Sequence, residues 1–201
     1  MRRTWLICGF LGLLLLGCDS APPKARRGNP EGVGKKDSSE SGDQNAKLDD
    51  SGGEVRLEGL TLTAPKGWPR KKPQSTIIQA EFVLPKAEGD ERDGRLTLSV
   101  AGGSIEANIE RWKDQFVGKL EKSHQEKIDV NGISVTLIDF SGEYDDKPGP
   151  FAAGVKRPGY RMIGAIIPVG DQLHFVKAVG PSKTMETHAE KIKAFVRSTK
   201  K

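Results

Sequence analysis

Residues 95–120 read RLTLSVAGGSIEANIERWKDQFVGKL, and this stretch decides the fold class. In its first part, residues 95–101, polar and apolar side chains alternate, which predicts a β-strand with one buried face. Gly102-Gly103-Ser104 then ends the strand and supplies a hydroxyl group that can cap a helix. The stretch therefore predicts a strand followed directly by a helix.

The second part of the stretch has helical periodicity. Glu106 places a negative charge in the first turn, where the helix dipole favours it. Apolar side chains recur every three or four residues, at Ile105, Ile109, Trp112, Phe116 and Leu120. This spacing predicts an amphipathic helix of about four turns over residues 105–120.

The flanking sequence is rich in strand patterns. Asn131-Gly132 and Gly170-Asp171 are dipeptides typical of tight hairpin turns. A glycine- and proline-rich loop is expected at 142–159, and an apolar stripe predicts a C-terminal helix at 182–197. The segments with strand composition are 57–64, 77–84, 127–131, 133–140, 160–169 and 172–179.

This element order predicts one α+β domain with a mostly antiparallel sheet of six to seven strands. Several strands are apolar on both faces, since neighbours such as Leu137 and Ile138 would point to opposite sides. A sheet that is apolar on both faces needs cover on both. We therefore expect one helix on each face of the sheet.

The order of these elements resembles the Mog1/PsbP-like fold. The residues that carry the resemblance are Ala64-Pro65-Lys66-Gly67-Trp68, Val179-Gly180-Pro181 and Phe195-Val196-Arg197-Ser198. Residues 102–112 with Gln115-Phe116, and residues 159–166, are also similar to uncharacterised planctomycete-type lipoproteins. The resemblance spans most of residues 55–201 and implies a fold but no reaction. The likeness to PsbP implies a membrane-associated accessory role.

The N-terminus has the features of a secretory signal. Met1-Arg2-Arg3 is positively charged, and the apolar run at residues 5–16 is shorter than the roughly 20 residues of a membrane-spanning helix. The run ends in Leu15-Leu16-Gly17-Cys18, which resembles a bacterial lipobox. This resemblance implies that residues 1–17 are removed and that Cys18 is lipidated. The alternative is that Cys18 is an ordinary free thiol.

Residues 18–54 differ in composition from the rest. Between residues 19 and 53 there is no aromatic residue, and Val33 and Leu48 are the only large aliphatic ones. Such a segment buries too little apolar surface to offset the entropy of ordering, so we expect a disordered tether. The expected organisation is a signal peptide at 1–17, a lipidated cysteine and tether at 18–54, and one domain at 55–201.

The charge pattern argues against nucleic acid as a partner. Residues 55–201 contain 24 basic and 19 acidic residues, spread along the chain. Their longest basic run, Arg70-Lys71-Lys72, is flanked by Pro69 and Pro73, and the clusters of basic residues with interleaved aromatics that are typical of nucleic-acid readers do not occur. We interpret the run as a solvated loop, with weak attraction to anionic lipid or wall polymer as the alternative.

The sequence has no recognisable catalytic or metal-binding motif. His124, His174 and His188 are dispersed, and no zinc, redox or nucleophile-elbow motif occurs. Asp145-Asp146 is read as a solvated turn rather than a cation site. We therefore expect a non-enzymatic protein with no metal and no cofactor.

The candidate contact residues are Asn108 and Arg111, three positions apart on the predicted helix, and Phe151 in the predicted loop. A structural role for Asn108 and Arg111 is the alternative. The leading hypothesis is a lipid-anchored protein on the extracytoplasmic side of the bacterial cell envelope, which presents a non-catalytic domain to an envelope protein partner. The second hypothesis is binding of a small anionic or carbohydrate ligand near Arg111 and the loop at 142–159.

Overall fold

The computed structural model describes residues 49–147 and 152–201. Nine strands and two helices occur in these ranges, and all strand pairs are antiparallel. Seven strands form the main sheet in the order β3-β4-β5-β9-β8-β7-β6, and β1 pairs with β2. The elements are β1 (Gly53–Leu57), β2 (Leu60–Ala64), β3 (Arg70–Lys71), β4 (Ile78–Leu84), β5 (Gly94–Ala101), α1 (Ile105–Lys113), β6 (Phe116–Val130), β7 (Ile133–Asp146), β8 (Val155–Val169), β9 (Gln172–Pro181) and α2 (Ser182–Arg197).

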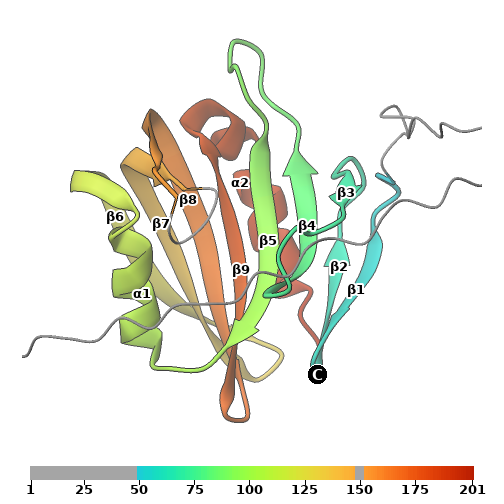
Figure 1. Cartoon of the computed structure of the whole chain (residues 1–201). Coiled ribbons are helices and arrows are strands. Elements are labelled where there is room, and N and C mark those ends of the chain that lie inside the picture. The colour runs from blue at the N-terminus through green and yellow to red at the C-terminus, as the bar shows by residue number, and fades with distance from the viewer. Residues whose placement is uncertain (1–48, 148–151) are drawn as a thin grey trace, which may run out of the picture. The chain divides into compact units, whose positions relative to one another are not determined.

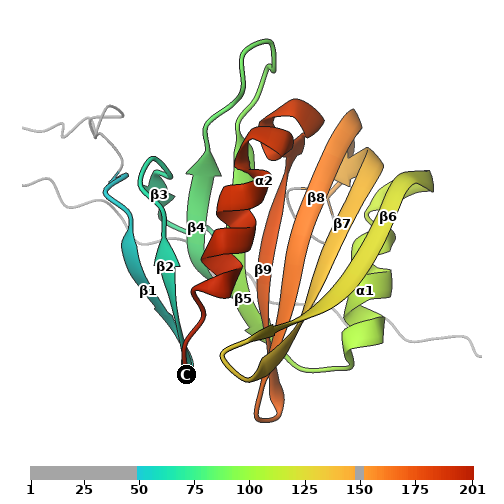
Figure 2. The same cartoon turned by 180° about the vertical axis from the view of Figure 1, so that it is seen from behind.

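The two helices cover opposite faces of the main sheet. Helix α1 lies in front of the sheet in Figure 1, over the side that carries β6, β7 and β8. Helix α2 lies across the other face, as the reverse view in Figure 2 shows. The predicted α+β class, the antiparallel sheet and the helices on both faces are confirmed.

The larger core lies on the α2 face. Helix α2 contributes Met185, Ile192 and Phe195, which pack with alternate residues of the central strands and with the β1–β2 hairpin. Trp68, between β2 and β3, is 1% exposed and packs edge-on against Phe195, with ring centroids 5.8 Å apart. The segment Ala64-Pro65-Lys66-Gly67-Trp68 therefore places a large side chain at the centre of this core.

The smaller core lies on the α1 face. Trp112 packs edge-on against Phe175 of β9, with ring centroids 5.8 Å apart. Gly164 of β8 lies directly beneath the indole: a Cβ at this position would be 2.3 Å from Cζ3 of Trp112. The absence of a side chain at Gly164 therefore lets α1 approach the sheet closely.

Helix α2 has the predicted bounds and is capped from a distant segment. Its N-cap residue, Pro181, makes no side-chain hydrogen bond to the helix. Instead, Oδ2 of Asp90, in the β4–β5 loop, accepts hydrogen bonds from the backbone N (2.7 Å) and Oγ1 (2.5 Å) of Thr184. The long β4–β5 loop is thereby fixed to the start of α2.

Three predicted boundaries are wrong. The helix predicted at 105–120 ends at Lys113, and Phe116 and Leu120 belong to β6. The strand predicted at 57–64 is interrupted by a turn at Glu58-Gly59, where Gly59 has a φ of +73°. Much of the loop predicted at 142–159 is strand, because β7 extends to Asp146 and β8 begins at Val155.

Residues 49–201 contain what an independently folding unit requires. The described part holds a seven-stranded sheet, a two-stranded sheet, two helices and two hydrophobic cores. The C-terminal Lys200 pairs with Thr61 of β2, which closes the hairpin onto the end of the chain. Neither α1 nor α2 is long and apolar enough to cross a membrane.

Candidate functional site: a basic cavity on the α1 face

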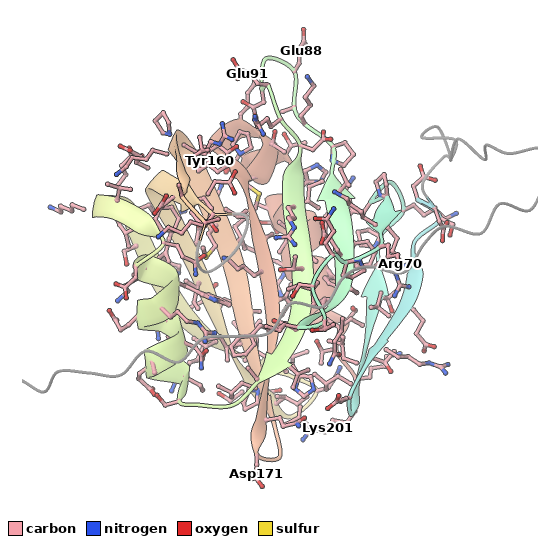
Figure 3. The ribbon with its side chains drawn as sticks, viewed as in Figure 1. Arg70, Glu88, Glu91, Tyr160, Asp171 and Lys201 are labelled. Carbon is pink, nitrogen blue, oxygen red and sulfur yellow. The ribbon has the colours of Figure 1, made fainter. Side chains whose placement is uncertain are left out.

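A cavity of about 620 Å³ lies on the α1 face, beside the part that α1 covers. In Figure 3, the labelled Tyr160 and Glu91 mark the end of the sheet where the cavity opens, and Asp171 marks the opposite end. The volume is within the range of small-molecule sites. The walls are formed by Lys71, Lys86, Glu91, Arg92, Asp93, Arg95, Thr97, Tyr144, Asp146, Lys147, Tyr160, Lys177 and Val179.

Positive charge dominates these walls. Six side chains are basic and three are acidic, and they come from β3, the β4–β5 loop, β5, the end of β7, and β9. In the described part of the chain, no carboxylate lies within ion-pair distance of Lys71, Lys86 or Arg92, all of which are exposed. These cations are therefore available to a ligand.

Lys177 forms the innermost charged group of the cavity. Alternation along β9 explains its position, since Val176 and Ala178 point into the α2-side core while Phe175 and Lys177 point to the α1 face. Nζ of Lys177 donates hydrogen bonds to Oε1 of Gln115 and to the hydroxyl of Tyr144, the latter at 3.2 Å.

The surroundings of Lys177 lower the pKa of its amino group. Burial, together with the positive charges of Arg95 and Arg111, lowers the pKa of Lys177 to about 7, and Asp146 opposes this shift. A lysine with such a pKa exchanges its charge near neutrality. An anion bound next to Nζ would favour the protonated form.

Tyrosine rings form the wall next to Lys177. Tyr144 and Tyr160 stack with centroids 6.1 Å apart and an interplanar angle of 7°, and Tyr144 also packs edge-on against Phe116 at 5.4 Å. The hydroxyl of Tyr144 donates a hydrogen bond of 3.0 Å to Oε1 of Gln115. Burial and the charge of Asp146 raise the pKa of Tyr144 to about 12, so its hydroxyl keeps its proton at neutral pH.

Ion pairs hold several of the charged side chains that line the cavity. Nη2 of Arg95 lies 2.9 Å from Oε2 of the buried Glu81, which raises the pKa of Arg95. Asp146 contacts Arg157 at 3.4 Å, and the neighbouring Asp145 contacts Lys147 at 2.9 Å. The predicted solvated Asp145-Asp146 turn is thus the end of β7, and both carboxylates face cations.

The structure does not place the predicted contact residues in this cavity. Asn108 is 3% exposed, and its Nδ2 donates hydrogen bonds to the backbone oxygens of Ser104 (2.8 Å) and Gly102 (3.5 Å) at the start of α1. Arg111 is exposed, with Cζ 6.0 Å from the centroid of Phe175. Phe151 and Cys18 lie outside the described residues.

The buried histidines are held by hydrogen bonds. Nε2 of His174 lies 2.5 Å from the backbone oxygen of Glu58, whereas its buried Nδ1 has no hydrogen-bond partner among the described residues. His188 contacts Trp68 and Pro85 in the α2-side core. Across 49–147 and 152–201, no group of three or more His, Cys, Asp or Glu side chains is arranged to hold a metal ion.

Sequence reasoning missed the cavity residues because they come from distant segments. Arg95, Tyr144 and Lys177 are far apart in the sequence, and only the strand order brings them together. One signal was available: Lys177 is the only Lys, Arg, Asp or Glu in the strand predicted at 172–179, where five of the eight residues are apolar. A charge at an inward position of such a strand indicates a polar site.

No family model and no curated protein matches this chain. Among solved structures, the chain is similar to cyanobacterial PsbP (CyanoP) from Synechocystis sp. PCC 6803, with a TM-score of 0.48 and 10% identity, over 80% of this chain and 98% of that one. It is also similar to PA94 from Pseudomonas aeruginosa, a protein of unknown function titled a putative regulator, with a TM-score of 0.45 and 17% identity, over 73% of this chain and 94% of that one.

Proposed function

We propose that this domain binds a small anion with more than one phosphate or carboxylate group, and that it does so as a non-catalytic binding domain. The observation that carries the proposal is the convergence of six basic side chains on one cavity of about 620 Å³. Convergent cations in a concave site attract anions and raise their local concentration. This corresponds to the anionic form of the second hypothesis, at a different part of the α1 face from Arg111.

The walls offer two kinds of contact to such a ligand. Lys86 and Arg92, on the β4–β5 loop, are exposed charges at the rim, whereas Arg95 and Lys177 lie on the strands. Charge-assisted hydrogen bonds from these groups contribute about 1.5–3 kcal/mol each. The ring of Tyr160 provides an apolar surface for a carbon skeleton between the charged groups.

Calorimetric titration of residues 49–201 with pyrophosphate and with citrate tests the proposal. We expect saturable binding that the variant Lys86→Gln/Arg92→Gln weakens at least tenfold, about 1.4 kcal/mol. The control Lys191→Gln/Arg197→Gln removes the same charge from α2, on the opposite face, and should leave the affinity within about twofold. Equal losses in both variants, or no saturable binding of either anion by the wild type, would refute the proposal.

Proton uptake gives a second, independent test. Because the pKa of Lys177 is about 7, roughly half of the molecules carry the neutral amine at pH 7. Anion binding should draw a proton onto Nζ, so the titration enthalpy should vary with the ionisation enthalpy of the buffer. Lys177→Gln should reduce this variation to the part that comes from the anion's own protonation. A wild-type enthalpy that is independent of the buffer would show that the anion does not contact Lys177.

The anchor and the location are also part of the proposal. The lipobox-like Leu15-Leu16-Gly17-Cys18 supports lipidation of Cys18 and presentation of the domain on the extracytoplasmic side of a bacterial membrane. Mass spectrometry of the mature N-terminal peptide tests this, because lipidation requires cleavage before Cys18 and added acyl mass. A free Cys18 thiol would overturn it. The envelope protein partner stays a prediction, and crosslinking in native membranes is its test.

A further inference from the structure

Strand β6 forms one edge of the main sheet and is exposed in its middle part. It pairs with β7 alone among the described strands, and Figure 2 shows it as the outermost strand on that side. Every side chain from Glu121 to Lys127 is exposed. One side of the β6 backbone therefore presents unpaired N–H and C=O groups, which is a template for another strand.

The sequence of this edge is complementary to itself in the antiparallel direction. Residues 121–127 read EKSHQEK. When two antiparallel copies are aligned so that His124 faces His124, residues at equal distances before and after His124 face each other. Glu121 then faces Lys127, Lys122 faces Glu126, and Ser123 faces Gln125. Each contact occurs twice across a two-fold axis, so four pairs of opposite charges form and no like charges meet.

The match continues beyond this segment and is specific for its register. Further outward, in the irregular stretch of β6 before Lys122, Leu120 would face Ile128 and Lys119 would face Asp129. If the two-fold axis moves by one residue toward the C-terminus, Glu121 faces Asp129. If it moves by one residue toward the N-terminus, Lys119 faces Lys127. Like charges placed directly opposite each other are unfavourable. The charge pattern thus selects the register centred on His124.

The backbone around His124 is suited to such pairing. The register of β6 with β7 is regular from Lys122 to Val130, and an irregularity between Val117 and Lys122 ends it. Lys122, His124 and Glu126 lie on the α2 face, next to Leu137 and Asp139. Residues that face each other in an antiparallel pair share a face, so Lys122 and Glu126 of two copies would meet there.

We propose that β6 binds β6 of a second copy of this chain, antiparallel about His124, so that two sheets become one continuous sheet. The contact is small, because only residues 122–126 pair within the regular part of β6 and residues 119–121 lie in the irregular stretch before Lys122, which predicts a weak and reversible dimer. Edge charges commonly prevent strand addition. Here the alternating charges of β6 are complementary to β6 of a second copy and mismatched with most other strands. This makes the pairing specific.

Two charge-swapped variants of residues 49–201 test the proposal by sedimentation equilibrium. Glu126→Lys/Lys127→Glu and Glu121→Lys/Lys122→Glu both keep the net charge, but each makes all four charge contacts repulsive in its homodimer. Because like charges placed directly opposite each other are unfavourable, we expect at least tenfold weaker dimerisation for each variant alone. Mixing the two variants restores all four attractive contacts, so the heterodimer should form within about threefold of the wild-type Kd.

The controls make each result decisive. The swap Glu190→Lys/Lys191→Glu on α2 also keeps the net charge and should leave the wild-type Kd unchanged. Lys122 forms an ion pair of 2.6 Å with the half-buried Asp139, which also contacts Arg161 at 2.8 Å and so keeps a cationic partner when Lys122 is replaced. A wild-type chain that stays monomeric at millimolar concentration, or a mixture that does not restore association, would overturn the proposal.

Disulfide trapping provides a measurement that does not depend on charge swapping. Residues 49–201 contain no cysteine, so His124→Cys introduces a single thiol. Residues that face each other in an antiparallel pair have Cα atoms about 4.5–5.5 Å apart, within reach of a disulfide. We expect rapid formation of a crosslinked dimer by His124→Cys and none by Thr187→Cys, an exposed position on α2. Equal rates for the two variants would contradict the proposed axis.

Discussion

Nε1 of Trp68 donates a hydrogen bond of 3.0 Å to Nδ1 of His188, in the centre of the α2-side core. The other ring nitrogen, Nε2, lies 2.9 Å from the backbone oxygen of Pro85. Because Nδ1 accepts a hydrogen bond, the proton of the neutral ring is on Nε2, which then donates to Pro85. One imidazole thus connects the turn after β2, the end of β4 and helix α2.

We expect His188→Phe to lower the free energy of unfolding by about 2–4 kcal/mol, because the indole N–H and the oxygen of Pro85 lose their partner in a buried site. Urea denaturation measures the change. The neighbouring Thr187→Ala, at an exposed position of the same helix, should change it by less than about 0.5 kcal/mol. A similar, small effect of both variants would contradict the structural role of His188.

Gly164→Ala should destabilise the protein by about 1–3 kcal/mol, because its Cβ would lie 2.3 Å from Cζ3 of Trp112 and would force α1 away from the sheet. The matched control is Gly102→Ala, since a Cβ at Gly102 would meet nothing within 4 Å. Thermal unfolding of the two variants measures the difference. If Gly164→Ala is as stable as Gly102→Ala, then Trp112 does not pack on β8 as described.

Asp90→Ala should lower the free energy of unfolding by about 1–2 kcal/mol, the typical value for a lost helix cap. The carboxylate of Asp90 accepts two hydrogen bonds from Thr184, so its loss frees the β4–β5 loop and the first turn of α2 together. Hydrogen exchange should show faster exchange at both places. The adjacent Glu91→Ala is the control, and equal exchange in the two variants would refute this capping contact.

Lys177 should make stability depend on pH. Its pKa is about 7 in the folded protein and about 10.4 in an unfolded chain, so the unfolded state binds more protons between these values. Stability should therefore rise from pH 7 to 9, and the destabilising contribution of Lys177 should be fully present below pH 7. The raised pKa of Tyr144 acts above pH 10 and lies outside this window.

Lys177→Met should accordingly be more stable than the wild type at pH 6, by on the order of a few kcal/mol, and this advantage should shrink by pH 9. Tyr144 and Gln115 keep their mutual hydrogen bond in this variant. Urea denaturation at pH 6, 7, 8 and 9 measures the difference, with the exposed Lys191→Met as control. A difference between Lys177→Met and wild type that is constant across this range would contradict the lowered pKa.

Local sequence patterns were sufficient where local interactions decide the structure. Helix α2 begins and ends where its apolar stripe predicted, and Asn131-Gly132 and Gly170-Asp171 form the predicted hairpin turns. Asn131 has a φ of +53°, which asparagine tolerates better than most residues. Such features depend on residues that are close in the sequence, so periodicity and turn chemistry identify them.

Local sequence patterns failed where pairing between distant strands decides the structure. Phe116 and Leu120 continue the spacing of α1, and both do pack with the α1-side core, but they reach it from a strand. Pairing of Phe116 with Tyr144 replaces the last turns of the predicted helix. The cavity was hidden for the same reason, since Arg95, Tyr144 and Lys177 meet only through the order of the strands.

The β1–β2 hairpin determines how the domain responds to tension on its N-terminal side. Gly53 pairs with Ala64 and Leu57 with Leu60, so the ladder opens toward residues 49 and 50, whose carbonyls accept hydrogen bonds from Arg70 and Gly67. A pull through residue 49 loads these bonds one after another, from the open end. We therefore expect β1 to detach from β2 at low force while the seven-stranded sheet stays folded. The hairpin thus yields first and limits the tension that reaches the main sheet.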